Sequence, residues 1–263
     1  TTMSDLNLLN SINKIYNLNY MSFNFKLIKP NFFKANLGLI VLKSDETIEH
    51  EIRSILDPEV SLLHSRIPCH LQVTPETLSK MEIDIPTAAE LLPSSVNYNV
   101  IGYACTSAST IIGTKKVQSL IQSKHSNTNV TDPIDSVKKA LKKLNCKKIS
   151  FVSPYSSIVT DVLKNYMEAQ GFKITNLICF EEDNDSVVAR ISEEDTLRAI
   201  IEINNSESEA IFASCTNLKT FNIINEAESI IKKPVISSNL ALAWNMLDIS
   251  GIKITNAPGA LFN

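Results

Sequence analysis

The sequence predicts an α/β protein with two similar lobes, each a parallel sheet flanked by helices. Short apolar runs alternate along the chain with stretches of helical periodicity, as in sheets whose parallel strands are joined by helical crossovers. The run over 37–42 is apolar throughout, which is typical of a strand buried on both faces. A length of 263 residues is sufficient for two medium domains.

The first half of the chain supplies three of these strands and two helices. The predicted strands cover residues 37–42, 60–66 and 99–104. A helix lies between the first two strands and ends at about Leu56. The second helix begins at Pro75, because Thr74 suits the N-cap position and proline suits the first helical position.

The second half repeats this order with four strands. They cover residues 148–152, 173–180, 210–213 and 234–237. The helices between and after them end at about Leu144, Ala169, Asn204, Ile231 and Leu247. Gly171 stops the helix that ends at Ala169, since glycine takes the left-handed conformation common after a helix.

Each half carries a Cys-Thr pair directly after a buried strand, at 105–106 and at 215–216. Asp45 lies 60 residues before Cys105, and Tyr155 lies 60 residues before Cys215. We expect both pairs to precede helices, at the carboxyl ends of strands where open α/β sheets bind ligands. The equal offsets therefore predict two lobes related by a pseudo-two-fold axis, with the active site in the cleft between them.

The predicted boundaries follow from this repeat. The first lobe covers 36–140 and is completed by 236–263, and the second covers 141–235. Residues 1–35 are rich in asparagine and weakly periodic. We expect them to form an arm or a short helix that packs on a neighbouring surface or on a partner subunit.

Composition excludes several classes of protein. A net charge of −3 disfavours a dedicated nucleic-acid binder, and no apolar run has the length of a membrane span. No glycine-rich nucleotide motif occurs, and the five cysteines and four histidines show no metal-ligand spacing. We therefore expect no cofactor and no metal. No secretory signal pattern is visible, so we expect a cytoplasmic protein with free thiols.

The paired Cys-Thr motifs suggest chemistry by two thiols. A thiol between a strand and a helix lies near free backbone N–H groups and the positive end of the helix dipole, which lower its pKa. The same N–H groups, with the hydroxyls of Thr106, Ser107 and Thr216, would bind a carboxylate. Two thiols on opposite sides of one carbon suit racemisation, epimerisation or cis–trans isomerisation. The alternative is that cysteines at strand ends only fill the core, which is our interpretation of Cys69, Cys146 and Cys179.

The motifs resemble those of the cofactor-independent aspartate/glutamate racemase superfamily. Within it, the chain looks like the branch of maleate cis–trans isomerases and arylmalonate decarboxylases. The segments that carry this resemblance are 100–109, 213–218 and 234–239. Residues 38–49 and 73–78 are most similar to the ectoine-utilisation subgroup of that branch.

The resemblance implies roles for individual residues. Cys105 would be the first catalytic cysteine and Cys215 the second. The carboxylate pocket would come from Thr106, Ser107 and Tyr155, and we also expect Thr216 and Asn217 to bind the substrate. Asp45 falls where the isomerases carry an asparagine that contacts substrate. Either Asn184 or Asp185 falls near a second such asparagine.

Three differences from the family's sequence patterns reduce the number of reactions that we expect of this chain. Asn217 follows the second Cys-Thr pair where amino-acid racemases usually carry histidine, and residues 43–45 replace their Asp-Ser-Gly. Cys105 is present, whereas the decarboxylases have a small residue there. Asp45 would place a carboxylate against a carboxylate of the substrate, and like charges repel. That favours a substrate with an amine or amide, such as an ectoine-derived diamino acid, over a bare dicarboxylate.

These observations lead to one main hypothesis and two alternatives. The main one is an isomerase or racemase that acts on a small carboxylate with two cysteines, as a homodimer or higher homo-oligomer. One alternative is maleate-type isomerisation by covalent addition of Cys105 to an alkene. The other is a protein without activity, either a small-molecule binding module or an inactive paralogue. Arg66 and Arg190 are further candidates to pair with a substrate carboxylate.

Overall fold

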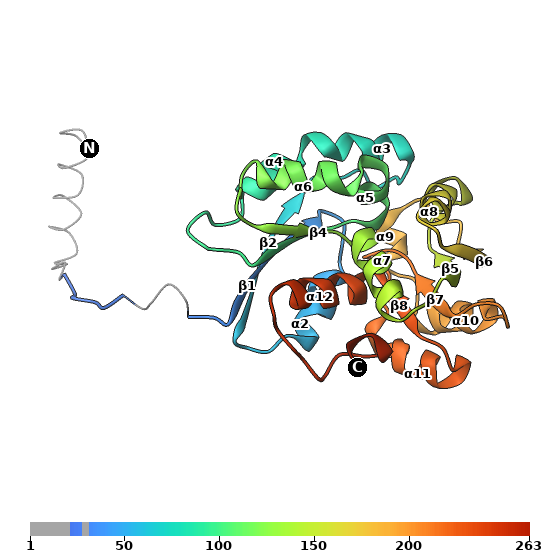
Figure 1. The fold of residues 1–263 in the computed structure, drawn as a ribbon. Coiled ribbons are helices and arrows are strands. Elements are labelled where there is room, and N and C mark those ends of the chain that lie inside the picture. The colour runs from blue at the N-terminus through green and yellow to red at the C-terminus, as the bar shows by residue number, and fades with distance from the viewer. Residues whose placement is uncertain (1–21, 28–31) are drawn as a thin grey trace, which may run out of the picture. The chain divides into compact units, whose positions relative to one another are not determined.

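The computed structural model of the chain describes residues 22–27 and 32–263. The chain divides into one unit over Thr1–Phe32 and another over Phe33–Asn263. All helices and strands given below belong to the second unit (Figure 1). The arm predicted over 1–35 lies mostly outside the described residues. No helix of the described part is long and apolar enough to cross a membrane.

The first sheet has four parallel strands in the order β2-β1-β3-β4. They are β1 (Ala35–Leu42), β2 (Val60–Ile67), β3 (Val100–Ala104) and β4 (Asn129–Thr131). Every residue of β3 is buried, in agreement with its unbroken apolar sequence. The sequence pattern did not predict β4, because three residues with an exposed asparagine carry no periodic signal.

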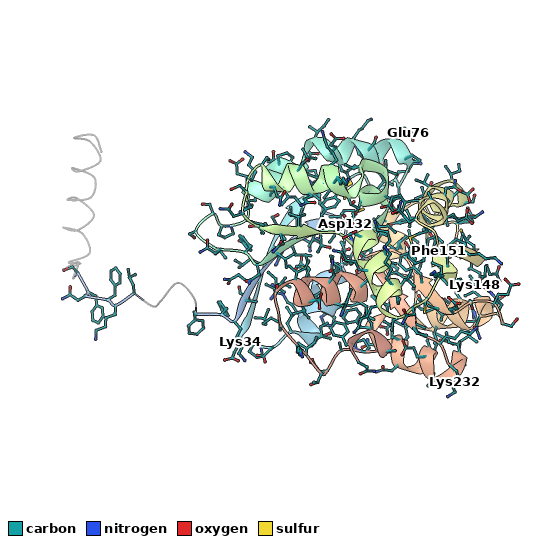
Figure 2. All side chains as sticks on the ribbon, viewed as in Figure 1. Lys34, Glu76, Asp132, Lys148, Phe151 and Lys232 are labelled. Carbon is teal, nitrogen blue, oxygen red and sulfur yellow. The ribbon has the colours of Figure 1, made fainter. Side chains whose placement is uncertain are left out.

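The second sheet has the same architecture, with strand order β6-β5-β7-β8. Its strands are β5 (Lys148–Ser153), β6 (Lys173–Cys179), β7 (Ala210–Ala213) and β8 (Val235–Ser237). Phe151, labelled in Figure 2, stacks on Phe212 of the adjacent strand with ring centroids 5.2 Å apart. The two four-stranded sheets and their helices confirm the predicted fold class.

Helices cover both sheets. Between the strands of the first half lie α2 (Ile48–Ile55), α3 (Pro75–Lys80), α4 (Ile85–Glu90), α5 (Thr106–Ile112), α6 (Thr114–Gln122) and α7 (Pro133–Lys143). The second half contributes α8 (Ser157–Ala169), α9 (Asp185–Val188), α10 (Glu193–Ile203), α11 (Phe221–Ile231) and α12 (Ser238–Ile249). Short 3₁₀ turns cover Met81–Ile83 and Ala260–Phe262.

Two local predictions about helix ends are confirmed. Thr74 and Thr77 form a reciprocal capping box at the start of α3, with Pro75 in the first turn. Gly171 follows α8 with φ of 88°, the left-handed conformation that favours glycine. Local side-chain chemistry is enough to place these ends.

Helix α12 connects the two lobes. It follows β8 of the second sheet directly, yet it lies beside α7 and contacts α2 and β3 of the first half (Figure 1). The contact with β3 is close, because a Cβ on Gly102 would lie 2.8 Å from the sulfur of Met246. The chain therefore returns to the first lobe at Ser238. The lobe boundaries at 140 and 236 stay a prediction.

A buried carboxylate joins α2 to the start of α11 and α12. Glu51 of α2 accepts the backbone N–H groups of Thr220 at 2.5 Å and Phe221 at 2.8 Å. It also accepts the side-chain amide of Asn239 at 2.6 Å. Burial raises the pKa of Glu51 to about 7, against the lowering effect of these hydrogen bonds. The folded chain therefore holds a proton on Glu51 more tightly than the unfolded chain does.

This shift predicts that the free energy of unfolding falls as pH rises. The ordinary pKa is 4.5 and the folded value is about 7, so the stabilisation is complete below pH 4.5 and is lost as pH rises through 7. Glu51→Gln should remove about 3 kcal/mol of that loss. Denaturant unfolding at several pH values between 4.5 and 8 measures the effect. Glu49→Gln on the same helix is the control, and an equal change of slope in both variants would contradict the prediction.

Candidate functional site

Cys105 lies between β3 and α5, as predicted. Its backbone is extended and its sulfur accepts the backbone N–H of Ala108 at 3.4 Å, so the thiol caps α5. The side chain is buried. The prediction that the first Cys-Thr pair joins a buried strand to a helix is confirmed.

Cys215 follows β7, but here the local structure differs from the prediction. The residues after it form a turn, and α11 begins only at Phe221. Cys215 takes a φ of 104°, a conformation that costs free energy in a residue other than glycine. Its backbone N–H donates to the hydroxyl of Ser238 at 3.0 Å, and its sulfur accepts the N–H of Asn217 at 3.3 Å. The strained turn is thus held by contacts with the start of α12.

The expected lowering of the thiol pKa is wrong. Burial raises the pKa of Cys105 and of Cys215 well above the ordinary value, and the nearby charge of Asp185 raises both further. The N–H groups of Ala108 and Asn217 act in the opposite direction but do not compensate. Both thiols are therefore protonated at neutral pH, and their chemistry needs a neighbouring base.

Asp185 is the buried carboxylate at the centre of this site. Its Oδ1 accepts the hydroxyl of Tyr155 at 2.9 Å, and its Oδ2 accepts the hydroxyl of Ser44. Tyr155 also lies 3.1 Å from the sulfur of Cys215. Because the single hydroxyl proton of Tyr155 goes to Asp185, the Cys215 thiol is the donor in that contact. A proton can thus leave Cys215 through Tyr155 to Asp185.

A second series of hydrogen bonds that leads to Asp185 begins at Cys69. Its sulfur lies 3.1 Å from the oxygen of Ser44, whose proton goes to Asp185. The Cys69 thiol is therefore the donor. The sequence pattern did not single out Ser44 or Cys69 for the site. Cys69 belongs to no motif, and only the tertiary structure brings it to Ser44.

Asp45 occupies the start of α2. Its Oδ1 accepts the N–H groups of Thr47 at 2.8 Å and Ile48 at 2.9 Å, whereas its buried Oδ2 has no hydrogen-bond partner. Burial raises the pKa of Asp45 to about 6. The hydroxyl of Ser107, next to the cysteine on α5, is likewise buried and without a partner. The hydroxyl of Thr216 also faces the Asp45 carboxylate, and neither Asp45 nor Ser107 is among the residues that line the cavity beside Cys105.

The structure distinguishes Asn184 from Asp185. The side chain of Asn184 accepts the N–H of Ser186 at 3.0 Å and so caps α9. Asp185 contacts Tyr155 and Ser44 instead. Of the two candidates, Asp185 is the one that lies among the functional side chains.

The hydroxyl groups of Thr106 and Thr216 donate hydrogen bonds to other groups of this chain. The hydroxyl of Thr106 donates to Ser238 at 2.8 Å, the same oxygen that accepts the N–H of Cys215. The hydroxyl of Thr216 donates to the carbonyl of Ala104 at 3.4 Å. Both threonines thus connect the two cysteine segments across the lobes.

Asn217 also joins segments that are distant in the sequence. Its side-chain amide donates to the carbonyl of Asp185 at 3.0 Å and to that of Ser44 at 3.3 Å. Its side-chain oxygen accepts the N–H of Glu46 at 2.8 Å. Contacts of Thr106, Thr216 and Asn217 with substrate stay a prediction, and in this structure the three position the loops.

The space between these side chains is small. A cavity of about 10 Å³ lies beside Cys105, Tyr155 and Asp185, and residues from 69 to 78 cover it. That volume has room for about one water molecule. Backbone hydrogen bonds hold the cover, from Val73 to Asp183 at 2.8 Å and from Asp185 to Leu71 at 3.0 Å. A cavity of this volume is too small for a four-carbon acid.

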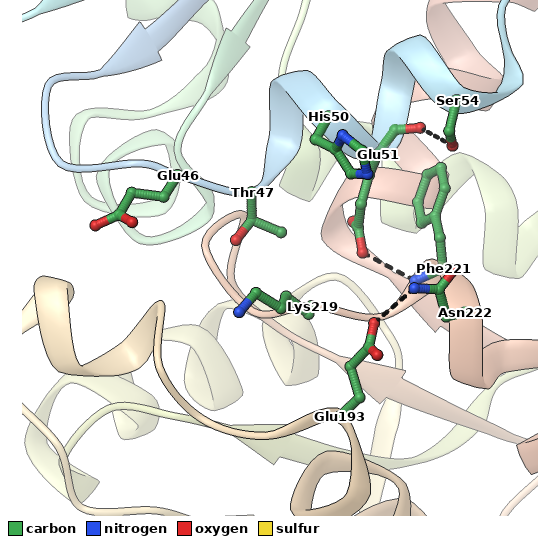
Figure 3. A pocket seen from close by; sticks show the side chains of 9 residues that line it. All are labelled: Glu46, Thr47, His50, Glu51, Ser54, Glu193, Lys219, Phe221 and Asn222. Carbon is green, nitrogen blue, oxygen red and sulfur yellow. Dashed lines mark hydrogen bonds between the residues drawn. The ribbon is translucent and has the colours of Figure 1, made fainter.

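A larger cavity of about 300 Å³ lies elsewhere (Figure 3). Its lining contains neither cysteine. It is formed by Glu46, Thr47, His50, Glu51, Ser54, Glu193, Lys219, Phe221 and Asn222. Within the described ranges, no three side chains are grouped as ligands for a metal ion. Of the two candidate catalytic cysteines, Cys105 lines the small cavity, and Cys215 is joined to that cavity through the hydroxyl of Tyr155.

Comparison with known proteins gives consistent matches over most of the chain. The profile of the arylmalonate decarboxylase family matches residues 38–262. A maleate isomerase from Alcaligenes faecalis is 28% identical over 239 residues, which cover 85% of this chain and 94% of that protein.

Solved structures of the same kind of enzyme share the fold of this chain. The maleate isomerase Iso from Pseudomonas putida S16 has the same fold, with a TM-score of 0.79 at 24% identity over 87% of this chain and 98% of that one. A mutant maleate cis-trans isomerase from Nocardia farcinica, with a covalently bound succinylcysteine intermediate, has a TM-score of 0.77 at 25% identity. It covers 87% of this chain and 98% of its own.

The raised thiol pKa values predict slow alkylation. At pH 7, Cys105 and Cys215 should react with iodoacetamide at least about tenfold more slowly than in the unfolded chain, because only the thiolate is nucleophilic. Their rates should still rise above pH 9, where an ordinary thiol is already ionised. Peptide mass spectrometry after timed alkylation measures both rates. Rapid alkylation of either cysteine at pH 7 in the folded protein would contradict the prediction.

Proposed function

We propose, because the chain belongs to the arylmalonate decarboxylase family, that it interconverts the cis and trans forms of a small unsaturated carboxylate with Cys105 and Cys215. The predicted superfamily branch is confirmed by the family match and by the maleate isomerases, and the chain is an isomerase. These relatives are enzymes, so the binding-module alternative is not supported. The link to ectoine utilisation stays a prediction.

The observation that carries this proposal is the pair of buried thiols at equivalent strand ends, with the buried carboxylate of Asp185 joined to Cys215 through Tyr155 and lining the same cavity as Cys105. Cys105 follows β3 and Cys215 follows β7, and the charge of Asp185 acts on both. The Nocardia farcinica enzyme carries a covalent succinylcysteine. A thiol that adds to an alkene and is later expelled gives such an adduct, and Cys105 is the thiol we assign to this step.

The proposed reaction is balanced within the site. Asp185 takes the proton of Cys105 through the water that the small cavity can hold, and the sulfur of Cys105 bonds to one alkene carbon. The π electrons move to the neighbouring carbon, which takes the proton of Cys215. Rotation about the new single bond follows. The Cys215 thiolate then removes a proton, the carbon–sulfur bond breaks, and Asp185 returns its proton to Cys105.

Racemisation is the second candidate, and Asp45 favours it. One thiolate would take a proton from a carbon next to a carboxylate, and the opposite thiol would deliver one to the other face. An amino acid would place its ammonium group near a carboxylate of the site, and the charge of the buried Asp45 acts on both thiols. An ectoine-derived amino acid belongs to this class. We also propose that the protein is cytoplasmic, that it forms a homodimer or higher homo-oligomer, and that its substrate is a small carboxylate.

Replacing either cysteine tests the function. With maleate and its monoamide maleamate as probes, proton NMR should show cis–trans conversion by the wild type. We expect Cys105→Ala and Cys215→Ala to lower the rate on the order of 1,000-fold or more, because each removes a bond-making group. Intact-mass spectrometry should detect a substrate adduct on Cys105. Activity that persists in both variants would overturn the proposal. If the enzyme instead incorporates deuterium from the solvent into an amino acid and no covalent adduct is detected, racemisation is favoured.

Tyr155→Phe tests the path between Cys215 and Asp185. The variant keeps the ring but removes the hydroxyl that joins the thiol to the carboxylate. Racemisation requires Cys215 to lose its proton first, so we expect the maximal rate of racemisation to fall about 100-fold with the KM little changed. Cis–trans conversion, in which Cys215 gives its proton to the substrate, should keep most of its rate. Tyr98→Phe is the matched control, because the buried hydroxyl of Tyr98 has no hydrogen-bond partner. Equal activity of both variants would exclude this path.

A further inference from the structure

We propose that Cys69 is a redox modification site, where hydrogen peroxide forms a disulfide bond between Cys69 and Cys105 across the small cavity. Both are free thiols in this structure. The loss of activity that follows rests on the proposed function, because Cys105 is the thiol assigned there to bond with the alkene. The disulfide itself does not depend on that assignment.

The first observation is the cavity that the two cysteines share. Cys69 and Cys105 both line it, and they are the two cysteines among its described lining residues. Its volume of about 10 Å³ has room for about one water molecule. Burial raises the pKa of the Cys105 thiol, and the charge of Cys69 raises it further, in agreement with two sulfurs that lie near each other. The two thiols therefore face one small space.

The second observation is the course of the chain after β2. Strand β1 lies between β2 and β3, and Leu42 at the end of β1 is opposite Ile67 of β2. Cys105 follows β3, on the other side of β1. Two residues after Ile67, the sulfur of Cys69 lies 3.1 Å from the hydroxyl of Ser44, which itself follows β1. The chain thus crosses the end of the central strand in the direction of β3, and this brings Cys69 toward Cys105.

The third observation is that solvent reaches one of the two thiols more easily. Cys69 is half-buried, whereas Cys105 is 5% exposed. Peroxide therefore meets Cys69 first. The hydrogen bonds from Cys69 to Ser44 and from Ser44 to Asp185 give the thiol proton a route to a carboxylate, and the thiolate is the form that peroxide oxidises.

The reaction consumes one peroxide and two thiols. The thiolate of Cys69 attacks one oxygen of the peroxide, the O–O bond breaks, and the hydroxide that leaves takes up the thiol proton to give water. The sulfenic acid that remains on Cys69 is then attacked by the sulfur of Cys105. The S–O bond breaks, and the hydroxide leaves as water with the proton of Cys105. The two sulfurs lose two electrons in all, and the peroxide gains them.

The disulfide has two effects on the site. It removes the free thiol of Cys105, which the proposed addition to an alkene requires. It also joins the cover of residues 69–78 covalently to the start of α5. The cover is otherwise held by hydrogen bonds such as that from Val73 to Asp183 at 2.8 Å. Exchange with a small thiol reduces the bond and restores both cysteines.

Peptide mapping tests the modification without any assay of activity. Reduced protein is treated with a few equivalents of hydrogen peroxide at pH 7.5, its remaining thiols are blocked, and it is digested without reductant. Trypsin cleaves after Arg66, Lys80 and Lys115, so the two cysteines lie in separate peptides, 67–80 and 81–115. We expect these peptides to be linked, two hydrogen atoms lighter than their sum, and to separate on addition of dithiothreitol.

Three variants test the order of the steps. In Cys105→Ala the sulfenic acid on Cys69 has no partner thiol, so dimedone should label Cys69. Cys69→Ser should form no disulfide, and dimedone should label its buried Cys105 at least about tenfold more slowly than it labels Cys69 in Cys105→Ala. Cys179→Ser is the matched control, because Cys179 is also half-buried but lies in β6, outside the lining of the cavity. It should keep the linked peptides.

The rate of the proposed reaction supplies a second measurement. Peroxide should lower the wild-type rate at least about tenfold, and dithiothreitol should restore it. Each variant is compared with its own untreated rate, and Cys69→Ser should lack this reversible loss.

The inference and the proposed function fail in different ways. Peptides 67–80 and 81–115 that stay unlinked, oxidation of Cys69 to a sulfinic acid without a disulfide, or a disulfide between Cys105 and another cysteine would overturn the inference. A wild type that forms the expected disulfide but converts no substrate contradicts the proposed function alone.

Discussion

The carboxylate of Asp185 is the interaction on which the site depends. It accepts hydrogen bonds from Tyr155, from Ser44 and, at 3.3 Å, from the side chain of Asn217. These donors come from three segments that follow β5, β1 and β7, so one buried charge holds strand ends of both sheets together. A charge buried in this way is tolerated only if hydrogen bonds surround it. Two of these partners, Tyr155 and Asn217, also contact the sulfur of Cys215 and so link this carboxylate to the second thiol.

Burial sets the chemistry of the site as well as its geometry. It raises the pKa values of both thiols and of Asp45, so the resting site favours protonated groups. The same closure leaves a cavity of about 10 Å³ beneath the cover of residues 69–78. A thiol that ionises only next to its substrate is protected from solvent and from side reactions. Burial is thus the common cause of the small cavity and of the protonated thiols.

Hydrogen bonds to buried polar side chains also join the two lobes. Glu51 of α2 accepts the first N–H groups of α11 and the side chain of Asn239 on α12. Ser238, one residue earlier, accepts the hydroxyl of Thr106 and the N–H of Cys215. The start of α12 is therefore the place where both cysteine segments and the helix of Asp45 converge. Buried polar groups at helix starts hold the two sheets in the arrangement that the chemistry needs.

The sequence by itself determined seven of the eight described strands, the two-lobed class, the start of α3, the end of α8 and the two Cys-Thr pairs, because apolar periodicity and capping are local properties of the chain. It missed β4, α4, α6, α9 and Cys69. Three of these elements, β4, α4 and α9, are too short for a clear periodic signal, and Cys69 belongs to no motif, whereas α6 buries Val117 and Ile121 at a helical spacing that was overlooked. Only the tertiary structure chose Asp185 over Asn184 and gave Cys215 a turn instead of a helix. It also reversed the expected direction of the thiol pKa shifts, because desolvation depends on segments far away in the chain, which no local pattern contains.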